Sequence, residues 1–106
     1  MTTDIDNSER DYPTGATNLK AYLAEYWKLD RNLPLHVVAT SSDCSSHRWL
    51  AFIPHGNGSC EVIEAFFVIT PNRGYWIRRG VKSVTEAEAR TEWTTAATHG
   101  EWHGTV

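Results

Sequence analysis

The sequence predicts an α+β domain: a four-stranded antiparallel meander sheet with an N-terminal and a C-terminal helix packed on one face. Three observations lead to this class. Apolar residues recur at helical spacing over 17–30 and again after residue 85, whereas β-rich segments occupy 35–79. The connections between those segments are short, which favours pairing between neighbours. The expected order is therefore α-β-β-β-β-α, with the helices covering the apolar side of the sheet.

The first helix is expected from Thr17 to Asp30, with Thr17 as its N-cap. Pro34 stops it, because the residue before a proline avoids helical geometry. One helical face carries an apolar stripe, which is formed by Leu19, Tyr22, Leu23, Tyr26 and Trp27.

Four strands are expected at 35–40, 47–53, 60–70 and 75–79. A serine-rich segment, 41–46, connects the first two. Turns rich in proline and glycine, 54–59 and 71–74, separate the others. The second helix begins after Val84, because Thr85 and Glu88 have the spacing of a capping box, and Gly100 suits a left-handed helix end.

The length of 106 residues suits one domain. Residues 1–14 are expected to form a flexible arm, 15–100 a single α+β domain and 101–106 a C-terminal tail. The net charge of −3 disfavours nucleic acid as a partner, because such binders usually carry a basic patch. With no long apolar stretch and no secretion signal, the chain is expected to be cytoplasmic and free of membranes.

Turn positions predict which side chains share a sheet face. If Thr40 faces His47, Ile53 faces Cys60 and Thr70 faces Tyr75, one face is almost wholly apolar, includes Leu50 and Phe52, and lies under the helices. The other face mixes aromatic, apolar and charged groups, which is typical of an interaction surface. The alternative is that one helix covers each face, or that the C-terminal tail folds over the second face. A one-residue slip at a turn would move all side chains of a strand to the opposite face. The expected partner-binding residues are Trp49, Phe66, Tyr75, Ile77, Arg79, His47 and Glu64.

No metal site or cofactor is expected. Cys44, His47, His55 and Cys60 have a spacing that resembles zinc ligands. However, His47 and His55 stand at opposite ends of one strand, which separates them by roughly 26 Å at ~3.3 Å per residue. The same separation argues against a disulfide between the two cysteines.

Two groups of residues could support catalysis. Asp43, Cys44 and His47 are close in sequence and contain a nucleophile and a base, although a serine-rich turn explains them as well. On the mixed face, His47, Glu64 and Arg79 could do acid–base chemistry or form a cross-strand ion pair.

The function expected from these features is that of a non-enzymatic protein-binding module, whose partner is another protein or a second copy of the chain. Single-stranded nucleic-acid binding, with bases stacked on Trp49, Phe66 and Tyr75, is one alternative. A small hydrolase-like enzyme that uses Asp43, Cys44 and His47 is another. Small acidic chains of this type are also encoded by phages and mobile elements to block host enzymes such as CRISPR nucleases. In that case the acidic residues of the arm or of the second helix (Glu86, Glu88, Glu92) would mimic phosphates.

Overall fold

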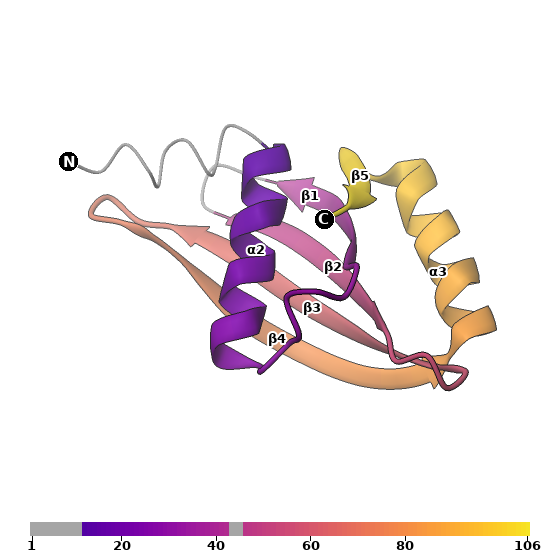
Figure 1. Ribbon diagram of the computed structural model, residues 1–106. Coiled ribbons are helices and arrows are strands. Elements are labelled where there is room, and N and C mark those ends of the chain that lie inside the picture. The colour runs from indigo at the N-terminus through magenta and orange to yellow at the C-terminus, as the bar shows by residue number, and fades with distance from the viewer. Residues whose placement is uncertain (1–11, 43–45) are drawn as a thin grey trace.

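The computed structural model describes residues 12–42 and 46–106. It confirms the α+β class, the antiparallel sheet and a helix toward each end of the chain. Neither helix in these described ranges is long and apolar enough to cross a membrane. In chain order the elements are α2 (Tyr12–Tyr26), β1 (His36–Ser42), β2 (Ser46–Pro54), β3 (Ser59–Ile69), β4 (Gly74–Thr85), α3 (Glu86–His99) and β5 (Trp102–Thr105) (Figure 1).

The sheet has five antiparallel strands in the order β4-β3-β2-β1-β5. The predicted meander accounts for the first four. The fifth comes from residues that were expected to be a tail, and it pairs with the outer edge of β1, where Val37 faces Gly104. Beyond that pairing, the backbone groups of Leu35 and Val106 exchange two hydrogen bonds of 2.9 Å. The C-terminus is thus part of the sheet.

Helix α2 starts earlier and ends earlier than the apolar stripe predicts. Its first turn includes residues 12–14, which were assigned to the arm, whereas residues 1–11 of the predicted arm lie outside the described residues. Just after the helix, Lys28 adopts a left-handed conformation with φ of 57°, which terminates the helical path before Asp30. The side chains of Ala16, Leu19 and Leu23 are fully buried against the sheet.

The two helices lie on opposite faces of the sheet, rather than together on one face as expected. The core under α2 joins Leu19 and Leu23 to alternate sheet residues such as Val37 and Ile63. The core under α3 joins Ala89 to the intervening sheet residues, among them Val38 and Val62. Figure 1 shows α2 crossing the side of the sheet that faces the viewer, with α3 standing apart at the right. Both faces are therefore partly covered, which was the alternative expectation.

A shift in the register of β2 explains this arrangement. Ala39 pairs with Trp49, and an irregularity follows between Ala39 and Ser41, so that His47 pairs with Ser42 instead of Thr40. At the other end, Pro54 rather than Ile53 faces Cys60. Because side chains alternate along a strand, a change of one position moves every side chain of β2 to the opposite face. Leu50 and Phe52 consequently lie under α3, and Trp49, Ala51 and Ile53 lie under α2.

Strand β4 positions the second helix. It was expected over 75–79 but continues to Thr85, which faces Ser59 at the end of the sheet. There the predicted capping box is confirmed: the Glu88 backbone N–H donates to Thr85 Oγ1 at 3.1 Å, and the Thr85 N–H donates to Glu88 Oε1 at 2.9 Å. Helix α3 therefore begins where β4 ends. It packs on the half of this sheet face that lies near Thr85.

Candidate partner-binding surface

The seven residues that were expected to share one open face are divided between the two faces. Phe66, Tyr75, Ile77, Arg79 and Glu64 lie on the α3 face, whereas Trp49 and His47 lie on the α2 face. The division follows the β2 register, since the two displaced residues both belong to that strand.

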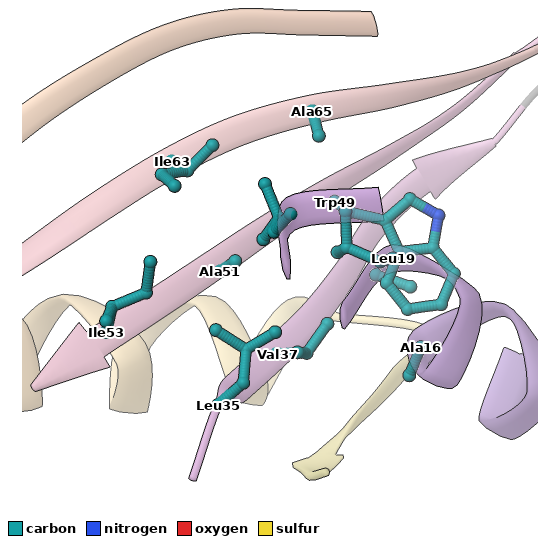
Figure 2. Close-up of a cluster of buried hydrophobic side chains, with 11 residues drawn as sticks. Ala16, Leu19, Leu35, Val37, Trp49, Ala51, Ile53, Ile63 and Ala65 are labelled. Carbon is teal, nitrogen blue, oxygen red and sulfur yellow. The ribbon is translucent and has the colours of Figure 1, made fainter. Parts of the chain in front are cut away.

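Trp49 is a core residue. Only 2% of its surface is exposed, and its indole lies 6.0 Å from that of Trp76 and 6.2 Å from that of Trp102, measured between ring centroids. Figure 2 shows it within the buried cluster that includes Leu19 and Ala16 of α2. The expectation that Trp49 contacts a partner is therefore corrected: it packs inside the molecule.

His47 is also separated from the groups with which it was expected to act. It is 8% exposed and pairs with Phe67 on the α2 face, whereas Glu64 pairs with Leu50 on a strand position that belongs to the α3 face. The carboxylate of Glu64 instead forms a hydrogen-bonded ion pair with Arg48. A cluster of His47, Glu64 and Arg79 is consequently not formed.

Four apolar side chains on the α3 face remain outside both cores. Phe66 faces Ile77 and Val68 faces Tyr75, so that two cross-strand pairs stand side by side on β3 and β4. All four are partly exposed, and among the described residues they belong to neither buried cluster. We call Phe66, Val68, Tyr75 and Ile77 the hairpin patch. Val68 was not among the predicted site residues, although alternation along the strand from Phe66 identifies it.

Two arginines are held over the aromatic rings of the hairpin patch. The guanidinium carbon of Arg73 lies 4.9 Å from the ring centroid of Tyr75, and that of Arg79 lies 5.5 Å from the ring of Phe66. At these distances the cations are attracted to the ring faces. Beside the patch, Arg48 donates to Thr40 Oγ1 at 2.8 Å and is paired with Glu64. The surface therefore has an apolar centre and a positively charged border.

Helix α3 leaves the hairpin patch uncovered because it packs on the opposite half of the face. Its contacts are with Val38, Leu50, Phe52, Cys60 and Val62, near the end of the sheet where β4 enters the helix. The patch lies toward the other end of the β3–β4 hairpin, which in Figure 1 extends to the left, away from α3.

The residues proposed for nucleophilic chemistry do not form a described site. Asp43 and Cys44 lie outside the described residues, and His47 is buried on the α2 face. Within 12–42 and 46–106, no three histidine, cysteine or acidic side chains are grouped in a way that could hold a metal. Burial raises the pKa of the Cys60 thiol, and the nearby carboxylate of Glu86 raises it further.

Two of the three acidic residues of α3, Glu88 and Glu92, take part in structural contacts. Glu88 completes the capping box, and its bonds to Thr85 lower the pKa of its carboxyl group. Glu92 forms an ion pair of 3.0 Å with Lys82 of β4. Glu88 therefore stabilises the N-terminus of the helix, and Glu92 holds the helix against β4.

Comparison with known proteins adds no functional assignment to this geometry. The surface that stands out is the hairpin patch with Arg73 and Arg79, which contains four of the seven predicted residues. No protein-family model matches the chain, and no significant match was found to a curated protein or to a solved structure.

Proposed function

We propose that this chain is a non-enzymatic protein-binding module whose partner docks on the hairpin patch. The observation that carries the proposal is the pairing of four partly exposed apolar side chains outside both cores, with two arginines held over their rings. Aromatic residues and arginine are the types that contribute most to binding energy at protein interfaces.

The hairpin patch is suited to binding because it is ordered in advance. Its side chains stand on paired strands, and cation–π contacts restrict the rotamers of Arg73 and Arg79. Long side chains lose conformational entropy when an interface immobilises them, so side chains already held in place lose less. A partner would consequently gain from the apolar contacts at a reduced entropic cost.

The charge of the patch favours a different protein over a second copy. In a symmetric dimer the same surface meets itself, so the arginines of both copies would share one interface. The carboxylate of Glu64, which lies on the same face of β3 as Phe66, is already paired with Arg48. We therefore expect a partner with an apolar contact surface bordered by Asp or Glu, which would pair with Arg73 and Arg79.

The other candidate functions have less support. Single-stranded nucleic acid would need Trp49, Phe66 and Tyr75 on one face, but Trp49 lies on the other. Inhibition of a host enzyme through acidic mimicry was expected from the arm or from Glu86, Glu88 and Glu92. The acidic residues of the arm lie outside the described residues, and on α3 both Glu88 and Glu92 have structural partners. Inhibition of such an enzyme through the hairpin patch remains part of this proposal.

The proposal is tested by capturing binding proteins from an extract of the native host. The bait is the tagged wild-type chain, the Phe66→Ala variant or the Arg79→Glu variant. Tyr26→Ala is the matched control, because Tyr26 is 68% exposed and lies on α2. We expect one partner that is recovered equally by the wild type and Tyr26→Ala, and at least about tenfold less by both patch variants, as for the loss of an interface hot spot.

Circular dichroism shows whether each variant remains folded, so that a loss of binding can be assigned to the surface. Equal recovery of the same proteins by all four chains would refute the proposal. Size-exclusion chromatography with light scattering shows whether the chain forms a dimer. A dimer that Arg79→Glu disrupts would mean that the patch binds a second copy of the chain and not a different protein.

A further inference from the structure

Strand β4 forms one border of the sheet and, among the described residues, pairs only with β3. Figure 1 shows it along the outer border, with β3 on its other side. The opposite border is formed by β5, which has four residues, whereas β4 has twelve. A long edge strand presents backbone N–H and C=O groups that a second extended segment can bind, a mode of recognition called β-strand addition.

The turn before β4 identifies which of its backbone groups face outward. The Thr70 N–H donates to the Arg73 carbonyl oxygen at 2.8 Å, so these two residues form a hydrogen-bonded pair. Hydrogen-bonded and non-hydrogen-bonded pairs alternate along an antiparallel ladder, so the backbone groups of Gly74, Trp76 and Arg78 point away from β3. No group of the described residues forms a hydrogen bond with them. This part of the edge is therefore available to another strand.

Strand β4 is positively charged, although the whole chain has a net charge of −3. It contains Arg78, Arg79 and Lys82 and no acidic residue. Lys82 is paired with Glu92, whereas the two arginines form no ion pair within 12–42 and 46–106. Both arginines are exposed, so their charges remain available to carboxylates of a partner.

Arg78 and Arg79 lie on opposite faces of the sheet, next to this edge. The guanidinium carbon of Arg78 lies 3.8 Å from the ring centroid of Trp27 on the α2 face, and that of Arg79 lies over Phe66 on the α3 face. A guanidinium held over a ring keeps its N–H groups along its rim, where a carboxylate can accept two of them. Both faces of an added strand would thus meet a positioned cation.

A second copy of the chain is a poor occupant of this edge. In a symmetric pairing of two β4 strands, the arginines of both copies would meet in one interface, and like charges on paired strands are destabilising. Charged side chains and bulges are devices by which edge strands avoid self-association, and β4 has a register irregularity that leaves Arg79 without a paired residue on β3. These features do not oppose a strand of opposite charge.

We propose that the partner contributes an extended acidic segment, which pairs with the outer edge of β4 over residues 74–79. This inference rests on the proposed function, because it names the part of the partner that docks beside the hairpin patch. Tyr75 and Ile77 of the patch stand on β4, on the α3 face. Since side chains alternate along a strand, the added segment would place apolar side chains beside these two residues and carboxylates beside Arg78 on the α2 face.

Two model peptides test the proposal: acetyl-VEVEVEV-amide and acetyl-VKVKVKV-amide, which share the alternation and carry opposite charges. Backbone hydrogen exchange is followed by NMR in the full ¹⁵N-labelled chain. In the free chain, the amides of Trp76 and Arg78 should be protected at least about tenfold less than those of Tyr75 and Ile77, which face β3. The glutamate peptide at saturation should slow exchange of the Trp76 and Arg78 amides by about tenfold or more, whereas the lysine peptide should leave it unchanged.

Three results would overturn the proposal. The first is exchange at Trp76 and Arg78 that the glutamate peptide does not slow up to its solubility limit. The second is full protection of these amides in the free chain, because the chain itself or a second copy would then occupy the edge. The third concerns Arg78→Glu, which should bind the glutamate peptide at least about tenfold more weakly than the wild type; equal binding would contradict an acidic partner segment.

The variant Phe66→Ala separates this inference from the proposed function. Phe66 stands on β3, one strand inward from the edge, so the variant should still bind the glutamate peptide with slowed exchange at Trp76. A captured host protein that requires Phe66 but leaves the Trp76 amide unprotected would refute strand addition and leave the hairpin patch as the docking site. Strand addition by the peptide without any captured protein that depends on Phe66 would support the edge as a binding site and refute docking on the patch.

Discussion

Trp49 and Trp76 meet edge to face across an intervening strand, with ring centroids 6.0 Å apart and ring planes at 68°. Trp49 stands on β2 and Trp76 on β4, and β3 lies between them. The β3 residue that pairs with Trp49 is Ala65, whose small side chain leaves room for the two indoles to approach. Tyr22 of α2 stacks on Trp76, with ring centroids 6.2 Å apart, so the aromatic cluster joins the helix to β2 and β4.

Replacement of Trp49 by Ala should therefore destabilise the fold. Loss of a buried aromatic side chain leaves a cavity and costs about 3–5 kcal/mol of the free energy of unfolding. Phe66→Ala should cost less, about 0.5–1.5 kcal/mol, because Phe66 is partly exposed and outside both cores. Urea denaturation measures both values, and a Trp49→Ala chain as stable as Phe66→Ala would show that the assigned core is incorrect.

The sequence predicted the elements well but misplaced the side chains of one strand. Hydrophobic periodicity, the Thr85–Glu88 spacing and the turn residues are local signals, and they located both helices and four strands. The face of β2 depends on the turn at either end, because one position of slip reverses all its side chains. The pairing shift after Ala39 has no signature in composition, so Trp49 was assigned to the surface.

The C-terminal strand was missed for a related reason. Residues 102–105 are too few to show alternation, and their pairing partner is β1, more than sixty residues earlier in the chain. Such a pairing depends on tertiary contacts, which local propensity does not report. Phe66, Tyr75, Ile77 and Arg79 were placed correctly together because the β3–β4 turn was predicted with the right parity.

Gly100 should resist substitution because of close packing, although its backbone is in an ordinary extended conformation with φ of −78°. A Cβ atom at this position would lie 2.6 Å from Val38 Cγ1 and 3.1 Å from the carbonyl oxygen of Ala39. Gly100→Ala is expected to lower stability by about 1–3 kcal/mol, the usual cost of overpacking. Gly80→Ala is the control, since nothing lies within 4 Å of its Cβ position. Thermal unfolding of the two variants should differ clearly, and equal melting temperatures would contradict the tight contact between β1 and residue 100.

The capping box predicts a dependence of stability on pH. The backbone and side-chain hydrogen bonds of Thr85 lower the pKa of Glu88 from its ordinary value of 4.5. A carboxyl group with a lowered folded-state pKa stabilises the fold fully above its unfolded pKa, and this contribution is lost as the pH falls through the folded pKa. The melting temperature of the wild type should thus exceed that of Glu88→Gln at pH 7, and the difference should shrink as the pH drops below about 4.5. A difference that does not shrink as the pH falls would contradict the capping role of Glu88.

Cys60 should affect stability at the opposite end of the pH range. Burial raises the pKa of its thiol above the ordinary value of 9.0, and the negative charges of Glu86, Glu61 and Glu92 raise it further. A raised folded-state pKa means that the neutral thiol is favoured in the fold, so its contribution is complete below pH 9.0 and declines as the pH rises toward the folded-state value. Between pH 8 and about 10.5, the wild type should therefore lose more stability in urea than Cys60→Ala, which has no thiol to ionise. An equal loss of stability in both chains would show that the thiol is solvated and that Cys60 does not belong to the core under α3.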